Sequence, residues 1–294
     1  MSSAFITTFS DKGYNTYAKQ FLLSYKKNVD CPLFIVKSND LKTKIVNEIK
    51  VDFPDVNIIE NHYKDQISEF IEKYNSKIDK KISSVDKDQA YRYAPHRFIH
   101  KPAAMLTCLN ELKSNNNLIK YLVWIDADSL ILSKDFIISI NDIKPGPNQI
   151  ASVFDRFTVN YIMEAGLIVL NLNNKFSIEF ISECYDIFIS GKIFNMMEWH
   201  DAYIFSFIIH KYPPDSFRKL SSEFNLNSFH PIVTHPLTIG QIDHLKGQLN
   251  KKQKLSLEVS TAKYLSYFLK NKKLLSKYTN FIVNIIRRLK IIRF

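Results

Sequence analysis

Two patterns of apolar and polar positions alternate along the first 210 residues of the chain. Short apolar runs of strand length are separated by longer segments in which apolar residues recur every three or four positions, as on one face of a helix. The runs that predict strands are residues 4–10, 32–38, 121–126, 149–155 and 164–173. Because such alternation is typical of a mostly parallel sheet covered by helices, the pattern predicts an α/β fold.

The longer segments predict helices at four places, and we expect the last of them to end at Pro213, since proline cannot continue a helix. Residues 60–90 are polar and charged, and they predict a helix with a mobile loop rather than a domain boundary. Residues 215–250 carry turn signals and no clear period. The predicted helices are residues 14–28, 97–112, 176–190 and 199–211.

Composition places the chain among ordered globular proteins, because 46% of its 294 residues are hydrophobic and 13% are aromatic. It has only six glycines, and neither GxGxxG nor GxxxxGK[ST] occurs. The usual fingerprints of dinucleotide-binding and P-loop proteins are therefore absent from the sequence.

Cysteine usage favours a reducing compartment. Cys31, Cys108 and Cys184 are far apart and odd in number, which supports neither a disulfide framework nor a zinc site. We expect three buried thiols. The first residues lack the basic region of a secretory signal, and no apolar run reaches the roughly 18 residues of a membrane span.

Asp126 and Asp128 stand one residue apart where the apolar run 121–126 ends. Ligands of α/β sheets gather beyond the carboxyl ends of strands, and two carboxylates there suit a hard divalent cation with phosphate oxygens. A solvated turn, or a helix N-cap formed by Asp128 and Ser129, is the structural alternative. A phosphatase of the haloacid-dehalogenase kind would use the first aspartate as nucleophile, but the late acidic pair of those enzymes is missing.

Four quoted segments carry a resemblance to a known family. "WIDADSLIL" (124–132) resembles the DxD segment of nucleotide-sugar glycosyltransferases with the GT-A fold, of the glycogenin-like and lipopolysaccharide galactosyltransferase-like kinds. "FIHKPAAML" (98–106), "EAGLIVLNLNN" (164–174) and "WHDAYIF" (199–205) follow the family order. The resemblance implies a Rossmann-like mixed sheet flanked by helices over residues 1–250. It also implies metal-dependent transfer of a sugar from a nucleoside-diphosphate donor to a hydroxyl.

The same resemblance implies a metal site for Mn²⁺ or Mg²⁺. Asp126 and Asp128 would be two ligands, and His244 in "IDHLKGQLNKK" (242–252) would be the third, with His230 and His235 as rivals. In that late segment Gly247 would let the backbone approach the phosphates, and Lys251 or Lys252 would neutralise their charge. Asn250 stands where the family lysine falls, so Lys251 is one residue late.

Further site residues are predicted on the helices and on the strand 164–173. Lys101 and Arg97 suit the donor phosphates, although Lys101 could instead extend to solvent. Asp201 is a candidate catalytic carboxylate that holds sugar hydroxyls or takes a proton from the acceptor, or it is a charge favoured at a helix N-terminus. Glu164, where the family often has asparagine, is the second candidate catalytic residue.

The net charge of +11 lies entirely in the last 44 residues. Residues 251–294 hold twelve Lys/Arg against one acidic residue, so residues 1–250 are neutral overall. Residues 262–294 contain no Pro or Gly, and an apolar stripe with cationic flanks predicts an amphipathic helix. We expect 278–294 to bind an anionic membrane surface. Packing on the body or on a second subunit is the alternative, and nucleic acid is not expected as a partner.

Together these features predict a catalytic domain at 1–250 and a basic helical tail at 251–294. The expected setting is cytoplasmic, peripheral on the inner face of the cell membrane, in bacterial surface glycan assembly such as lipopolysaccharide or capsule, with a glycan or lipid-linked acceptor. A phosphatase or nucleotidyl-transfer enzyme that uses Asp126 and Asp128, or a non-catalytic membrane-binding protein, is the alternative.

Overall fold

The computed structural model describes residues 2–114, 118–156, 163–226, 228 and 230–245. The predicted tail helix, the boundary at residue 250, and the candidate donor-binding residues Gly247 and Lys251 lie outside the described residues.

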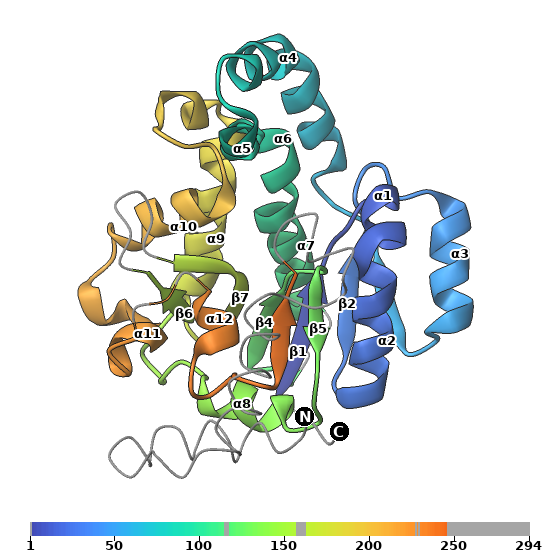
Figure 1. Ribbon diagram of the computed structural model, residues 1–294, viewed down its shortest axis with the longest axis vertical. Coiled ribbons are helices and arrows are strands. Elements are labelled where there is room, and N and C mark those ends of the chain that lie inside the picture. Colours follow the sequence, from blue (N-terminus) through green and yellow to red (C-terminus); the bar gives the residue numbers. More distant parts are fainter. Residues whose placement is uncertain (1, 115–117, 157–162, 227, 229, 246–294) are drawn as a thin grey trace, which may run out of the picture.

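A seven-stranded sheet forms the centre of the protein, with the strand order β3-β2-β1-β4-β7-β6-β8 (Figure 1). Neighbouring strands are parallel except where β7 runs antiparallel to β4 and β6. The predicted α/β fold with a mixed sheet is therefore confirmed. The strands are β1 (Ser3–Thr7), β2 (Leu33–Val36), β3 (Val56–Ile59), β4 (Tyr121–Ile125), β6 (Ala151–Asp155), β7 (Met163–Asn171) and β8 (Phe217–Lys219).

A second, two-stranded ribbon pairs β5 (Ser129–Ile131) with β9 (Ile242–His244) in antiparallel register. The helices and short helical turns that surround both sheets are α1 (Asp11–Gly13), η1 (Tyr14–Ala18), α2 (Lys19–Asn28), α3 (Thr43–Asp52), α4 (Lys64–Ser83), α5 (Lys87–Ala90), η2 (Tyr91–Tyr93), α6 (Pro95–Phe98), α7 (His100–Ser114), α8 (Phe136–Asp142), α9 (Phe176–Ile189), η3 (Lys192–Asn195), α10 (Asp201–Ile209), η4 (Pro214–Ser216), α11 (Leu220–Glu223) and α12 (Pro231–Thr234).

The sheet is buried on both faces because successive strand residues point to opposite sides. In β4, Leu122 and Trp124 pack in a core with α7, α9 and α10, whereas Val123 and Ile125 pack in a second core with α2, α3 and α8. In Figure 1, α2 and α3 lie to the right of the sheet, and α4 rises above α7 at the top. This layering leaves the edge beyond the end of β4 for the site.

Several sequence-based expectations need correction in their details. The mobile loop expected within 60–90 is short, because α4 continues to Ser83 and α5 begins at Lys87. The edge strand β3 and the helix α3 before it were not predicted. Cys108 and Cys184 are buried free thiols as expected, but Cys31 is only half-buried because it lies in the short loop before β2.

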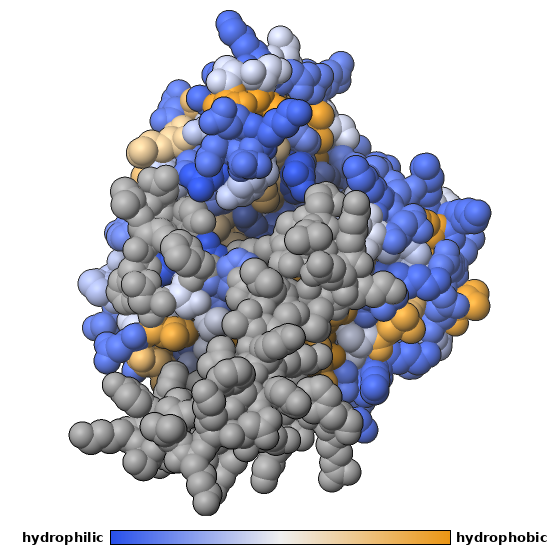
Figure 2. All heavy atoms as spheres, in the orientation of Figure 1, coloured by the Kyte–Doolittle hydropathy of each residue, from blue (hydrophilic) through white to orange (hydrophobic). Residues whose placement is uncertain are grey.

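Charged side chains cover much of the surface. On the face shown in Figure 2, hydrophilic side chains predominate over α4 and over the side of α2 and α3, with a few apolar patches between them. Among the described helices, none combines the length and the apolar character that a membrane crossing requires.

Candidate active site

A tight turn between β4 and β5 places the two aspartates of the DxD segment. The amide of Asp126 donates to the carbonyl of Gly166 (2.9 Å), and the amide of Ser129 donates to the carbonyl of Asp126 (3.0 Å). Because the strand β5 begins at Ser129, Asp128 does not cap a helix, and that alternative is excluded. Both carboxylates therefore lie at the carboxyl end of β4, where a ligand site is expected.

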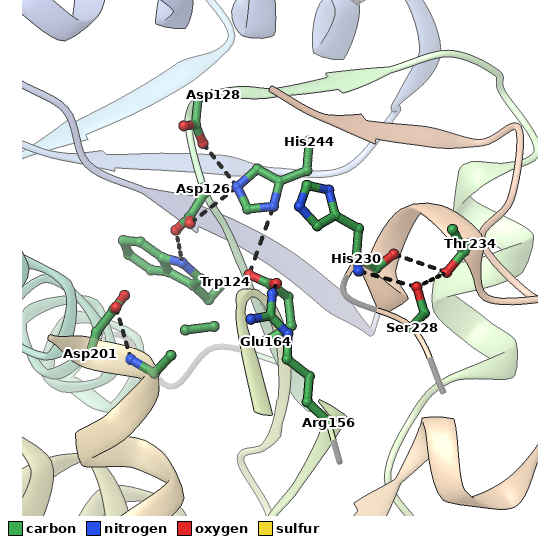
Figure 3. Close-up of polar contacts among 12 residues, drawn as sticks. Trp124, Asp126, Asp128, Arg156, Glu164, Asp201, Ser228, His230, Thr234 and His244 are labelled. Carbon is green, nitrogen blue, oxygen red and sulfur yellow. Dashed lines mark hydrogen bonds and ion pairs between the residues drawn. The ribbon is translucent and has the colours of Figure 1, made fainter. Parts of the chain in front are cut away.

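His244 reaches the aspartates from β9, 116 residues beyond Asp128 in the sequence. It is paired with Ser129 in the ribbon, and the amide of Leu245 donates to the carbonyl of Asp128 (2.8 Å). Its Nε2 lies 3.1 Å from Oδ1 of Asp128 and 3.6 Å from Oδ2 of Asp126 (Figure 3). One ligand atom from each of the three side chains lies within 4.8 Å of the others. Two carboxylate oxygens and one imidazole nitrogen fit a divalent cation such as Mn²⁺.

The rival histidines are placed differently. His235 is fully buried, its Nε2 lies 3.1 Å from the carbonyl of Leu220, and its Nδ1 accepts from the amide of Leu237 (3.2 Å). In Figure 3, the His244 ring lies between His230 and the two aspartates. In the described part of the chain, His244 is the histidine that shares a metal-ligand group with both aspartates.

Lys101 joins two of the predicted site residues. Its Nζ lies 2.8 Å from Oδ1 of Asp126 and 2.5 Å from Oδ2 of Asp201, and it donates to the carbonyl of Ala165 (2.9 Å). The side chain is buried, so it does not extend to solvent. These three partners match the three donors of an ammonium group, which favours a role in holding the two aspartates. Arg97, on α6, is exposed; donor binding by Arg97 and Lys101 stays a prediction.

Asp201 begins α10, and its Oδ1 accepts from the amide of Ala202 (2.8 Å). Burial disfavours its charged form, but the Lys101 ammonium and His200 together outweigh burial and lower the pKa of Asp201 to about 2. The same balance lowers the pKa of Asp126, and the two aspartates raise the pKa of Lys101 although burial acts in the other direction. All three groups are therefore ionised at neutral pH.

A second group of buried charges flanks Asp201. His200 Nε2 lies 2.6 Å from Oε2 of Glu198, and Arg92 donates to Oε1 of Glu198 (2.7 Å). Nδ1 of His200 lies 3.9 Å from Oδ1 of Asp201. Burial lowers the pKa of His200, but the two carboxylates outweigh it, so the pKa is raised above the ordinary value. The charged residues at the start of α10 therefore do not serve the helix dipole alone, because Asp201 also contacts Lys101 in the site.

Glu164 lies on the other side of His244. Its Oε1 is 3.9 Å from Nδ1 of His244, and its Oε2 forms an ion pair with Arg156 (Figure 3). Both Glu164 and Arg156 are buried. The structure therefore places Glu164 behind the imidazole, on the side away from Asp128.

Sequence reasoning missed three contributors to the site. Trp124 is buried in the core, and its Nε1 also donates to Oδ1 of Asp126 (2.7 Å). Arg156 and Glu198 were not singled out as site residues. The sequence did contain a signal for a carboxylate partner of Lys101. A lysine within an apolar helix is buried only when it is paired, so it predicts a carboxylate nearby.

Among the described residues of the site, carboxylates outnumber lysine and arginine side chains. Five carboxylates and three such cations converge here, and this acidic composition suits a divalent cation. The carboxylates are Asp126, Asp128, Glu164, Glu198 and Asp201, and the cations are Arg92, Lys101 and Arg156.

No protein-family model and no curated protein matches the chain. Several solved structures are similar to the chain. Mouse xyloside xylosyltransferase 1 is 10% identical, over 85% of this chain and 99% of that chain, with a TM-score of 0.50. An active-site mutant of LgtC, a galactosyltransferase, is 11% identical, over 83% of this chain and 88% of that chain, also with a TM-score of 0.50. This likeness shows that the chain has the GT-A fold that these glycosyltransferases share.

Proposed function

We propose that this GT-A-fold protein is a metal-dependent glycosyltransferase that moves a sugar from a nucleoside-diphosphate donor to a hydroxyl acceptor. The observation that carries the proposal is the convergence of Asp126, Asp128 and His244 at the carboxyl end of β4. In α/β sheets this edge is where ligands bind, and the fold is one in which sugar transfer is known.

The same three residues would hold the cation. Bound there, it would supply positive charge to the diphosphate that leaves when the sugar is transferred. Mg²⁺ prefers oxygen ligands, whereas an imidazole ligand suits a transition metal, so the His244 nitrogen favours Mn²⁺ over Mg²⁺.

Asp201 has the chemistry of a hydrogen-bond acceptor for the donor sugar. A general base works best with a pKa near the operating pH, and a carboxylate whose pKa is lowered to about 2 takes up a proton poorly. The ionised carboxylate instead accepts hydrogen bonds from hydroxyls and stabilises positive charge that develops on the sugar. Of the two roles predicted for Asp201, we therefore propose the holding of sugar hydroxyls.

The proposed acceptor is a glycan or a lipid-linked glycan, in the assembly of a bacterial surface polysaccharide. Support comes from the sequence, since residues 278–294 combine four basic residues with an isoleucine-rich stripe that suits an anionic membrane surface. The protein would then work in the cytoplasm, peripherally on the inner face of the membrane.

Thermal unfolding of the full chain tests the function. A ligand that binds only the folded state stabilises it by about 2.7 kcal/mol at 100 times its Kd. We expect Mn²⁺ together with one nucleoside diphosphate, or its sugar, to raise the melting temperature more than either alone. Stabilisation by phosphate monoesters alone would favour a phosphatase, and no response to any nucleotide would favour a non-catalytic membrane-binding protein.

A further inference from the structure

The strand β7 is irregular where it passes the site. Its register with β6 shifts between Val153, paired with Ile168, and Phe154, paired with Glu164, so residues 165–167 of β7 have no counterparts on β6. Irregularities of this kind are common beside functional sites, where they redirect backbone groups and side chains. Here the carbonyl of Ala165 accepts from Lys101 and the carbonyl of Gly166 accepts from Asp126.

Gly166 makes room for the His244 ring. A Cβ atom at position 166 would lie 2.6 Å from Cε1 and 2.9 Å from Nδ1 of His244, and 3.1 Å from Cδ1 of Ile232. The first two distances are far shorter than any ordinary contact between such atoms. The ring can lie against the backbone of β7 only because residue 166 has no side chain.

Glu164 faces the same ring, because residues two apart in a strand share a face. Its Oε1 lies 3.9 Å from Nδ1, while Nε2 of the ring faces Asp126 and Asp128. If Nε2 is to bind a cation, Nδ1 must carry the proton, and a carboxylate beside Nδ1 favours that tautomer. The ion pair with Arg156 fixes the carboxylate in this position.

We propose that residues 164–166 position the metal-binding histidine, with Glu164 as a positioning residue that orients the His244 ring so that its Nε2 faces the two aspartates. Gly166 sets how closely the ring approaches β7, and Arg156 holds Glu164 in place. The inference rests on the proposed function for the presence of a metal. It gives Glu164 a role different from the catalytic one predicted from the sequence, since Glu164 acts through His244.

Titration of the full chain with Mn²⁺ is the first test. Loss of an outer partner of a metal-binding histidine typically weakens metal affinity about 10–100-fold, and we expect a loss in that range for Glu164→Gln. Glu179→Gln, which changes an exposed glutamate on α9, is the matched control and should bind Mn²⁺ as the wild type does. Equal affinity of Glu164→Gln and wild type would overturn the proposal.

A second variant covers the risk that Glu164→Gln, which leaves Arg156 beside a neutral amide, fails to fold. Gly166→Ala changes no charge and forces the His244 ring to move, so it should also weaken Mn²⁺ binding at least about tenfold. In a His244→Ala background, Glu164→Gln should cause no further loss, because the two residues act through one contact. The same loss in both backgrounds would overturn the proposal.

The orientation of the His244 ring gives a readout that needs no metal. In crystal structures of the metal-free protein, we expect Nδ1 of His244 to face residue 164 in the wild type and the ring to turn away from this orientation in Glu164→Gln. An unchanged orientation in Glu164→Gln would overturn this inference. If the wild type has the expected orientation but binds no Mn²⁺, the proposed function fails instead, so the two failures are distinguishable.

Discussion

The Nζ atom of Lys101 lies 2.5 Å from Oδ2 of Asp201, and both side chains are buried. The same ammonium lies 2.8 Å from Asp126, so one cation joins a proposed metal-binding carboxylate to a proposed sugar-binding one. Lys101 belongs to α7, Asp126 follows the end of β4, and Asp201 begins α10. These three elements are far apart in the sequence. The lysine therefore fixes the distance between the two halves of the proposed site.

Replacing Lys101 should destabilise the protein strongly. Lys101→Met leaves the buried carboxylate of Asp201 and the partly exposed carboxylate of Asp126 without their shared cation, and breaking a buried ion pair from one side costs about 3–5 kcal/mol. Denaturant unfolding measures the loss. Lys113→Met, an exposed position on the same helix, is the control and should change the free energy of unfolding by less than about 0.5 kcal/mol. A loss below about 1 kcal/mol for Lys101→Met would contradict the assigned role.

Asp128→Asn should separate metal binding from folding. Asp128 is not fully buried, since 17% of its side chain is exposed, so we expect the metal-free variant to unfold within about 1 kcal/mol of wild type. Its Mn²⁺ affinity should fall at least about tenfold, because a charged carboxylate ligand is replaced by a neutral amide oxygen. Calorimetric titration measures this, with Asp135→Asn at an exposed position as the control. Unchanged Mn²⁺ affinity would remove Asp128 from the metal site.

The contribution of Asp201 to stability should vanish in acid. Burial opposes its charge, but Lys101 lowers the folded-state pKa to about 2, below the value of about 3.9 for an unfolded aspartate. The stabilisation is therefore fully present above about pH 4 and is lost as the pH falls toward 2. Asp201→Asn should cost more free energy of unfolding at pH 6 than at pH 3. Urea unfolding at both values checks this, and an equal cost at both would contradict the shift.

Removing residues 278–294 tests the membrane proposal. The segment carries four basic residues, each contributing on the order of 1 kcal/mol near an anionic surface. The full chain should float with vesicles that contain anionic lipid but not with neutral ones. The shortened chain should remain in the unbound fraction, and Mn²⁺ with nucleotide should still raise its melting temperature. Equal flotation of the two chains would show that the lipid contact lies elsewhere or does not exist.

Much of the fold could be predicted from the sequence because the central strands are continuous apolar runs. β4 and β7 are buried on both faces and stood out at 121–126 and 164–173. The edge strand β3, with none of its four residues fully buried, lacks such a run and was missed. Edge strands are covered on one side only, so their composition resembles that of a loop.

The site was predictable only in part. Asp126 and Asp128 are adjacent to the strand that positions them, so their spacing carried the information. His244 comes to them through the pairing of β9 with β5, and a contact across 116 residues leaves no local pattern. Family resemblance supplied that residue. The positions of Glu164 behind the histidine and of Lys101 between two aspartates depend on packing between elements, which periodicity does not encode.

Release of nucleoside diphosphate from the nucleotide sugar that best stabilises the chain tests the central claim most directly. We predict release by the wild type with Mn²⁺, loss of release with EDTA, and recovery when Mn²⁺ is restored. Asp128→Asn should release at background level, while Asp135→Asn should match the wild type. Undiminished release after EDTA treatment, or from Asp128→Asn, would contradict a metal-dependent transfer at this site.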